Sequence, residues 1–161
     1  IDTVSGVVEP VHTPPALRPP ITTAFALRAH DGPEVDLLPA ASRTRLFGGA
    51  FTAAAQIDRM GIRLEGALLS IASDGKMTSA PVFPGCVQCP ENGEPILLMA
   101  DAQTTGGYPR IAQICRADLH QLGQVRPRSH VRLIARTLDQ ARDDYAAKAG
   151  LFADWLPGFH L

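Results

Sequence analysis

Short apolar runs alternate with clusters of glycine, proline and polar residues along most of the chain. Runs of this length, bounded by turn residues, predict β-strands. The expected strands cover residues 25–28, 51–57, 63–71, 83–88, 96–100, 111–115 and 131–134. The expected helical stretches are 37–46, a single turn at 118–122, and a segment from Thr137 or Leu138 to Lys148. Since long helices do not alternate with the strands, we predict a mainly β fold, a barrel or closed sandwich with a few short helices.

Proline and glycine divide the chain into a central domain and two flanking segments. Five prolines fall between Pro10 and Pro20, so residues 1–24 are expected to form an extended linker or arm. Residues 25–149 are expected to form one domain, in which Asn92-Gly93 predicts a hairpin turn. Gly150 is expected to end the last helix and leave residues 150–161 as a tail. Because the chain begins at Ile1 rather than at methionine, we expect a processed chain or a fragment.

The composition is that of a globular domain. Hydrophobic residues make up 45% of the chain and charged residues 19%, with a formal net charge of -1. No dense Lys/Arg cluster suggests a nucleic-acid partner, and no apolar run is as long as a membrane span. Three cysteines are too few for a disulfide framework and suit a reducing compartment, so a cytoplasmic location is expected.

Cys86 and Cys89 have the spacing of a redox or metal-binding pair. In an extended strand, however, residues three apart point to opposite faces. A zinc site needs four ligands, and the chain has no second CxxC motif, no HxxxH motif and no ligand spacing among its histidines. We therefore favour a packing role for both cysteines and expect no metal.

The densest group of polar residues follows the apolar run 96–100. It holds Asp101, Gln103, Thr104, Thr105, Gly106, Gly107 and Tyr108. Paired glycines let the backbone approach a ligand closely or adopt positive φ, and their N–H groups, with the threonine hydroxyls, can form a nest for an anion. Asp101 is the candidate general base or orienting carboxylate, and Tyr108 a candidate donor. The alternative is a Gly-Gly turn with a proline exit, in which Asp101 caps the loop and Tyr108 packs.

Two arginines are further candidates. Arg59 and Arg63 share one face of an extended strand, and a planar guanidinium suits a carboxylate or a phosphate. Asp58 and Glu65 are close enough in sequence to pair with them instead, although Asp58 falls on the opposite face from Arg59.

Two glutamines complete the candidate set. The side chains of Gln88 and Gln103 each offer a donor and an acceptor that match a lactam or a ureido group. Each can equally tie down a neighbouring loop, because a buried amide must find partners.

Three motifs occur in the order found in one known family. They are residues 58–66 (DRMGIRLEG), residues 84–96 (PGCVQCP, then GEPI), and residues 101–109 (DAQTTGGYP), the last followed by Asp118-Leu119. From about Phe25 to Ala149 the chain resembles the allophanate hydrolase subunit 2 family, also called the biotin-dependent carboxyltransferase-domain family. Members include the C-type subunit of 5-oxoprolinase and part of the carboxyltransferase domain of urea carboxylase. Members are longer than this chain, which resembles their second half only.

The resemblance implies a cyclophilin-like β-barrel and a role in an ATP-dependent 5-oxoprolinase, which opens the cyclic amide of 5-oxoproline to glutamate. It implies two partners, the absent first half and a protein like the B-type subunit of 5-oxoprolinase, with ATP bound by this chain or by a partner. In this interpretation Asp101 and Arg59 are catalytic, and Gln88 and the loop 101–108 hold the amide. One alternative is a biotin-dependent carboxyltransferase domain acting on urea or a related amide, with biotin carried on another domain. The other is a non-catalytic module that binds a partner.

The chain departs from the family pattern at two positions. The family usually has an acidic residue after the serine that precedes the Pro-Gly pair, whereas here Ala80 follows Ser79. One candidate functional carboxylate is therefore missing, which favours the non-catalytic alternative. The usual Gly-Asp turn before the last strand is Arg128-Ser129 here, a change expected to be structural.

Overall fold

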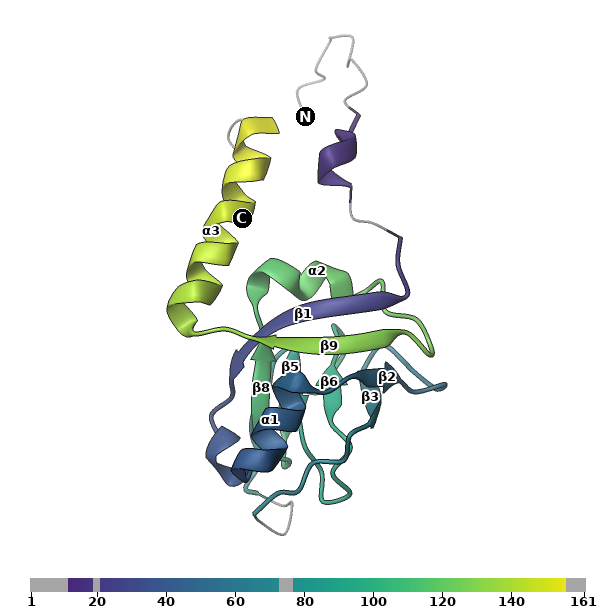
Figure 1. Ribbon diagram of the computed structural model, residues 1–161, viewed down its shortest axis with the longest axis vertical. Helices are drawn as coiled ribbons and strands as arrows, with labels where there is room; N and C mark the ends of the chain where they lie inside the picture. Colours follow the sequence, from purple (N-terminus) through teal and green to yellow (C-terminus); the bar gives the residue numbers. More distant parts are fainter. Residues whose placement is uncertain (1–11, 19–20, 73–76, 156–161) are drawn as a thin grey trace, which may run out of the picture.

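The computed structural model describes residues 12–18, 21–72 and 77–155, and a closed β-barrel forms its centre (Figure 1). Within these residues seven strands follow one another around the barrel in the order β1-β8-β5-β6-β3-β2-β9. Their bounds are β1 Ala24–Asp31, β2 Phe51–Ala53, β3 Gly61–Gly66, β5 Cys86–Gln88, β6 Ile96–Leu98, β8 Arg110–Ile114 and β9 His130–Ala135. Neighbouring strands are antiparallel except β1 and β9, whose parallel pairing closes the barrel. The prediction of a mainly β barrel is confirmed.

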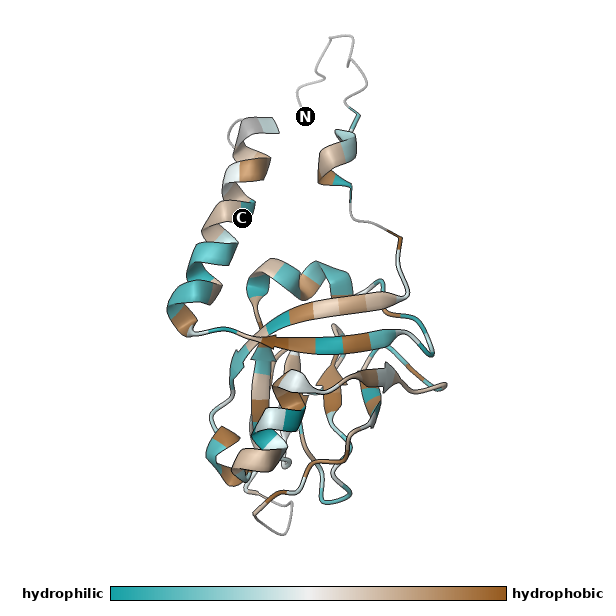
Figure 2. Ribbon diagram, viewed as in Figure 1, coloured by the Kyte–Doolittle hydropathy of each residue, from teal (hydrophilic) through white to brown (hydrophobic). Residues whose placement is uncertain are grey.

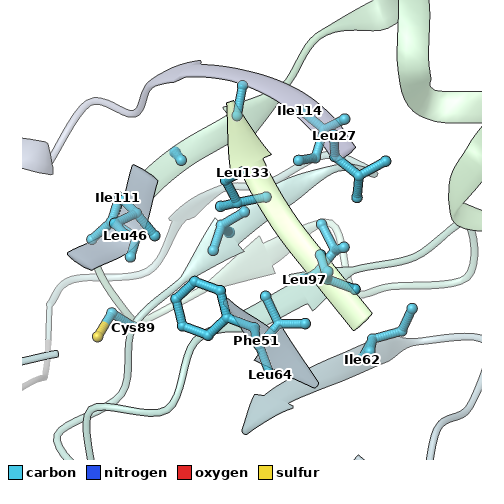
Figure 3. Close-up of a cluster of buried hydrophobic side chains, with 14 of the residues drawn as sticks. Leu27, Leu46, Phe51, Ile62, Leu64, Cys89, Leu97, Ile111, Ile114 and Leu133 are labelled. Atoms are coloured by element: carbon cyan, nitrogen blue, oxygen red, sulfur yellow. The ribbon is translucent and has the colours of Figure 1, made fainter. Parts of the chain in front are cut away.

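Apolar side chains that alternate along the strands fill the barrel (Figure 3). In β1 the buried residues are Phe25, Leu27 and Ala29, and the residues between them are more exposed. This period of two is expected for strands with one face in a core. The inward residues of the other strands are at most 1% exposed, among them Phe51, Ile62, Leu64, Leu97, Ile111 and Leu133. The opposite face of the same strands is therefore available to build a site.

Two of the expected helical stretches lie against the barrel. The stretch expected at 37–46 is divided at Pro39 into a short 3₁₀ turn, Val35–Leu37, and the helix α1, Ala40–Gly48. Proline cannot donate a helical N–H bond, so it separates the two. The turn expected at 118–122 is confirmed as α2, Leu119–Leu122, which follows a 3₁₀ turn, Arg116–Asp118.

The third helix, α3, spans Leu138–Trp155 and extends away from the barrel (Figure 1). It begins with a reciprocal cap, in which Gln140 N donates to Thr137 Oγ1 (3.2 Å) and Thr137 N donates to Gln140 Oε1 (3.0 Å). The expectation that Gly150 ends this helix is wrong, because a single glycine costs a helix only about 1 kcal/mol and does not by itself stop it. Residues 150–155 of the expected tail are thus helical, whereas 156–161, like residues 1–11 of the expected arm, lie outside the described residues. Figure 2 shows that the half of α3 next to the barrel is mostly hydrophilic.

Three strands are shorter than the apolar pattern predicts, and this shortening makes room for the site. β2 ends at Ala53 instead of residue 57, β3 ends at Gly66 instead of 71, and β5 begins at Cys86 instead of 83. The side-chain pattern does not show where pairing with a neighbouring strand stops, which is why these bounds differ. Outside the barrel, β4 (Ala80–Pro81) and β7 (Thr105–Gly106) pair as a two-stranded sheet.

Two turns lie next to strands that border the site, one between β5 and β6 and one before β9. Gly93 has a φ of 75° in the turn between the antiparallel strands β5 and β6, so the predicted hairpin is confirmed. Before β9, Arg128 has a φ of 65°, a left-handed conformation that favours glycine. Arg128 N donates to Ala53 O (2.9 Å), and Ala53 N donates to Ser129 O (2.8 Å). This turn therefore fixes the end of β2, where the chain leaves the sheet.

Candidate functional site

A cavity of about 690 Å³ lies against the outer face of β3, β6 and β5. Arg63 of β3 and Ile96 of β6, which are register partners, face it. Their neighbours Ile62, Leu64 and Leu97 belong to the barrel core instead. The volume is within the range of small-molecule sites, roughly 300–1,000 Å³. The lining consists of Ala54, Ala55, Gln56, Ile57, Asp58, Met60, Gly61, Arg63, Glu65, Gln88, Ile96, Leu98, Gln103 and Tyr108.

Gln88 is the buried polar side chain of this lining, with an exposure of 1%. Its Nε2 donates to the backbone oxygen of Tyr108 over 3.1 Å. Gly106 packs against the same amide so closely that a Cβ there would stand 2.6 Å from Gln88 Nε2. The paired glycines thus allow a close approach, as predicted, but the group that Gly106 approaches belongs to the protein.

The segment 104–107 contains the short paired strand β7, Thr105–Gly106. Thr105 and Gly106 pair with β4, and Val82 N donates to Thr104 O over 3.0 Å. Neither Gly106 nor Gly107 has a positive φ. The two glycines therefore do not form a nest of the type that needs a left-handed residue, and anion binding by this loop stays a prediction. The exposed side chains of Thr104 and Thr105 are not part of the cavity lining.

Arg59 and Asp101 form an ion pair with each other at the rim. Arg59 Nε lies 2.7 Å from Asp101 Oδ2, and the two side chains are 85% and 44% exposed. Asp101 N also donates to Arg59 O over 3.0 Å. Neither residue lines the cavity, although their neighbours Asp58, Met60 and Gln103 do. The structure therefore brings the two predicted catalytic residues together, but outside the lining.

The charged groups of the lining come from β3 and the turn before it. Arg63 Nη1 lies 3.4 Å from Glu94 Oε2, in a largely exposed pair. Asp58 Oδ1 accepts the N–H groups of Met60 (2.8 Å) and Gly61 (3.0 Å), so this carboxylate closes the turn and does not pair with Arg59. Glu65 faces the cavity without an ion-pair partner among the described residues.

Gln103, Gln56 and Tyr108 complete the polar lining, and no described residue hydrogen-bonds to their side chains. The sequence pattern indicated Gln103 and Tyr108 but not Gln56, which fell within the expected strand 51–57. The run of three alanines, 53–55, could have shown that the strand ends before Gln56, because alanine has low β propensity. In the structure β2 does end at the first of these alanines.

The cysteines pack, as predicted. Cys89 belongs to the barrel core and Cys86 to a separate cluster with Val82 and Leu98. Burial raises the pKa of each of these two thiols to about 11, so both stay protonated at neutral pH. Among the described residues no group of three or more His, Cys, Asp and Glu side chains is placed to hold a metal ion. No helix in this part of the chain has the length and apolar character needed to cross a membrane.

Comparison with known protein families gives a match over most of the chain. The model described as "Carboxyltransferase domain, subdomain A and B" matches residues 3–135. The chain belongs to this family. It is 41% identical over 115 residues to the C-type subunit of 5-oxoprolinase from Escherichia coli strain K12, covering 71% of this chain and 37% of that protein. The identity to the C-type subunit of 5-oxoprolinase from Haemophilus influenzae is 39% over 122 residues, covering 76% of this chain and 40% of that protein. The chain thus spans about two fifths of the length of these relatives.

Solved structures share the fold of this chain. The crystal structure of TTHA0988 superposes with a TM-score of 0.66 at 33% identity, over 78% of this chain and 24% of that one. The Kluyveromyces lactis urea amidolyase superposes with a TM-score of 0.82 at 19% identity, over 96% of this chain and 10% of that one. The second likeness supports the fold alone. Ala80, at the position where the resemblance led us to expect an acidic residue, pairs with Gly106 in the small sheet beside Gln88.

Proposed function

We propose that this chain is part of an ATP-dependent 5-oxoprolinase and that its outer-face cavity holds the cyclic amide of 5-oxoproline. One observation carries the proposal: the amide side chains of Gln56, Gln88 and Gln103 and the guanidinium of Arg63 converge on one cavity. They do so in a chain 41% identical over 115 residues to a protein named as the C-type subunit of 5-oxoprolinase.

The chemistry of these groups matches that of the ligand. A lactam presents one N–H donor and one carbonyl acceptor, which side-chain amides complement. Its carboxylate suits the planar fork of Arg63. The ion pair of Arg63 with Glu94 is long and reached by solvent, so a ligand carboxylate can take the place of Glu94. In this proposal Tyr108 and Gln103 bind the ring. Thr104, Thr105, Gly106 and Gly107, which lie outside the lining, hold the loop that carries these two side chains.

The pair at the rim has a separate proposed role. Arg59 Nε lies 2.7 Å from Asp101 Oδ2, and Arg59 has no other ion-pair partner among the described residues. In this proposal Asp101 orients the Arg59 guanidinium beside the cavity, next to the lining residues Asp58 and Met60. There Arg59 would hold negative charge that develops on the amide as it is opened.

ATP does not fit the described lining. The lining contains the carboxylates of Asp58 and Glu65, one arginine and no lysine, a poor match for a triphosphate. We therefore assign ATP to a partner subunit or to a part of the protein outside this chain, and no step here proceeds through it. Biotin belongs only to the alternative function.

Two other functions keep some support. The family description favours a carboxyltransferase, which would act on urea or a related amide through the same amide-binding groups. A non-catalytic partner-binding role is favoured by the mutual pairing of Arg59 and Asp101 and by Ala80 in place of a carboxylate.

The test is reconstitution with candidate partner subunits, including a B-type 5-oxoprolinase protein, followed by measurement of ATP hydrolysis that depends on 5-oxoproline. We expect turnover with wild type, a raised KM with Gln103→Leu, and a lowered kcat with Arg59→Ala or Asp101→Ala. Arg43 and Asp31 form a matched exposed pair away from the cavity, so Arg43→Ala is the control and should leave both constants unchanged.

Two outcomes would contradict different parts of the proposal. If Arg59→Ala and Asp101→Ala keep full turnover, their catalytic assignment is wrong although the function stands. If reconstituted protein hydrolyses ATP only with urea or bicarbonate and biotin present, the carboxyltransferase is the correct function.

A further inference from the structure

The orientation of the Gln88 side-chain amide is determined by its surroundings. The backbone oxygen of Tyr108 can only accept a hydrogen bond, so the nitrogen of the Gln88 amide must face it. The oxygen, Oε1, must then point elsewhere. No described residue donates a hydrogen bond to Oε1, although the Gln88 side chain is 1% exposed and lines the cavity.

Two features of the backbone hold the amide in this position. Gly106 leaves no room for the amide to move toward β7, since a Cβ at that position would already meet Nε2 at 2.6 Å. The register between β5 and β8 shifts between Val87 and Gln88, so Gln88 pairs with Arg110 while Val87 pairs with Ala112. Irregularities of this kind redirect side chains and are common beside active sites.

We infer that Gln88 Oε1 is a fixed acceptor that selects ligands with an N–H donor, and that Gly106 is the positioning residue that keeps it so. A nearly buried amide oxygen without a protein donor is satisfied by water until a ligand enters. A ligand that displaces this water must supply a donor of its own, or the oxygen is left unpaired. This inference rests on the proposed function, because it takes the cavity to be the ligand site, and it adds which part of the ligand is recognised.

The consequence is a preference for amides over esters of the same shape. A lactam ring carries N–H where the corresponding lactone carries an ether-like oxygen, which repels Gln88 Oε1. A site built around such a hydrogen bond rejects the analogue that lacks the donor far more strongly than a site that recognises shape alone.

The experiment is a calorimetric titration of the 161-residue chain with 5-oxoproline, with its lactone analogue 5-oxotetrahydrofuran-2-carboxylate, and with urea. We expect wild type to bind the lactam at least about tenfold more tightly than the lactone. Gln88→Leu should bind both rings equally, because its affinity for the lactam falls while its affinity for the lactone is unchanged. Gln88→Glu keeps an acceptor but places a carboxylate oxygen against Tyr108 O, and it should lose most of the preference.

Gly106→Ala tests the positioning role separately. The added methyl group meets the far end of a side chain rather than backbone, so the fold should persist while the amide is displaced. We expect this variant to lose the lactam preference while the affinity for the lactone stays the same. Gly150→Ala is the matched control, because a Cβ there meets nothing within 4 Å, and it should bind like wild type. The double variant Gly106→Ala/Gln88→Ala should regain thermal stability relative to Gly106→Ala without regaining the preference.

The outcomes separate this inference from the proposed function. Equal binding of lactam and lactone by wild type, or a preference that survives Gln88→Leu, overturns the inference even if the reconstituted complex turns over 5-oxoproline. A Gln88-dependent interaction with urea but not with 5-oxoproline supports the inference and contradicts the proposed function. If none of the three ligands binds to folded wild type, the inference is overturned.

Discussion

Two arginine–aspartate pairs of similar length occupy opposite environments in this protein. Arg59 Nε lies 2.7 Å from Asp101 Oδ2 at the rim of the cavity, with exposures of 85% and 44%. Arg28 Nη2 lies 2.6 Å from Asp118 Oδ1 beneath α2 and α3, with exposures of 28% and 2%. Solvent screens the first pair. The second pair is buried and also binds the backbone, because Asp118 Oδ2 accepts hydrogen bonds from both Arg28 N and Arg28 Nε over 2.9 Å.

The comparison distinguishes an exposed pair that a ligand can reach, Arg59–Asp101, from a buried pair that stabilises the fold, Arg28–Asp118. Burial by itself would raise the pKa of Asp118, but the hydrogen bonds from the side chain and backbone of Arg28 outweigh it and lower that pKa below its usual value. Arg28 also contacts Asp144 of α3 at 2.8 Å, so the buried pair joins the barrel to the helix. The rim pair joins two loops and is open to solvent, so a ligand can reach it.

The largest expected effect is on the buried pair. Asp118→Ala leaves Arg28 without its main partner, and we expect it to lower the free energy of unfolding by about 3–5 kcal/mol. Asp118→Asn keeps the volume and one acceptor oxygen, so it should lose less. Urea denaturation measures both effects. Asp139→Ala is the control, since Asp139 is 82% exposed and its one ion-pair partner among the described residues is Arg142. A loss for Asp118→Ala no larger than that of the control would remove the distinction between the two pairs.

An intermediate effect is expected at Glu34, whose pair with Arg110 is 15% and 20% exposed. The hydrogen bond from Arg110 lowers the pKa of Glu34 below its usual value of 4.5. The unfolded chain then takes up the proton more readily than the folded one, so this contribution to stability is present above about pH 4.5 and is lost as the pH falls below it. Glu34→Gln should therefore be less stable than wild type at neutral pH, by about 1–3 kcal/mol, and should lose less stability on acidification. Parallel pH curves for the two proteins would contradict this assignment.

The smallest effect on stability is expected at the rim. Arg59→Ala, Asp101→Ala and the double variant should each change the free energy of unfolding by roughly 0–1 kcal/mol, with little coupling between the two positions. The same variants are expected to lower turnover in the reconstituted complex, so the rim pair should show large functional and small structural effects. A double-mutant cycle in urea measures the coupling. A coupling energy as large as that of a buried pair would mean that the rim pair is structural.

The sequence predicts the barrel well because alternation over short strands is a local property. Leu27, Phe51 and Leu133 are inward residues that any strand with one buried face would place in the core. The loop 101–109 is likewise visible as a cluster of polar residues after an apolar strand.

The arrangement of the site is less visible because it depends on contacts between distant segments. Nothing local shows that Gly106 packs on Gln88, that Arg59 pairs with Asp101, or that Gln56 leaves the sheet after Ala53. Gly106 and Gly107 suggested an anion-binding nest, but Gly106 pairs with β4, which lies more than twenty residues earlier in the chain. The dipeptide itself does not show that Gly106 pairs with so distant a segment.

The most direct test of the central claim, that the outer-face cavity is the ligand site, is a titration of the isotope-labelled chain with 5-oxoproline followed by NMR. We predict that the perturbed signals belong to Gly61, Gln88, Gln103 and Tyr108, including the side-chain amides of the two glutamines. Saturable perturbations confined to the residues around Asp118 and α3, or none around the cavity, would contradict the account.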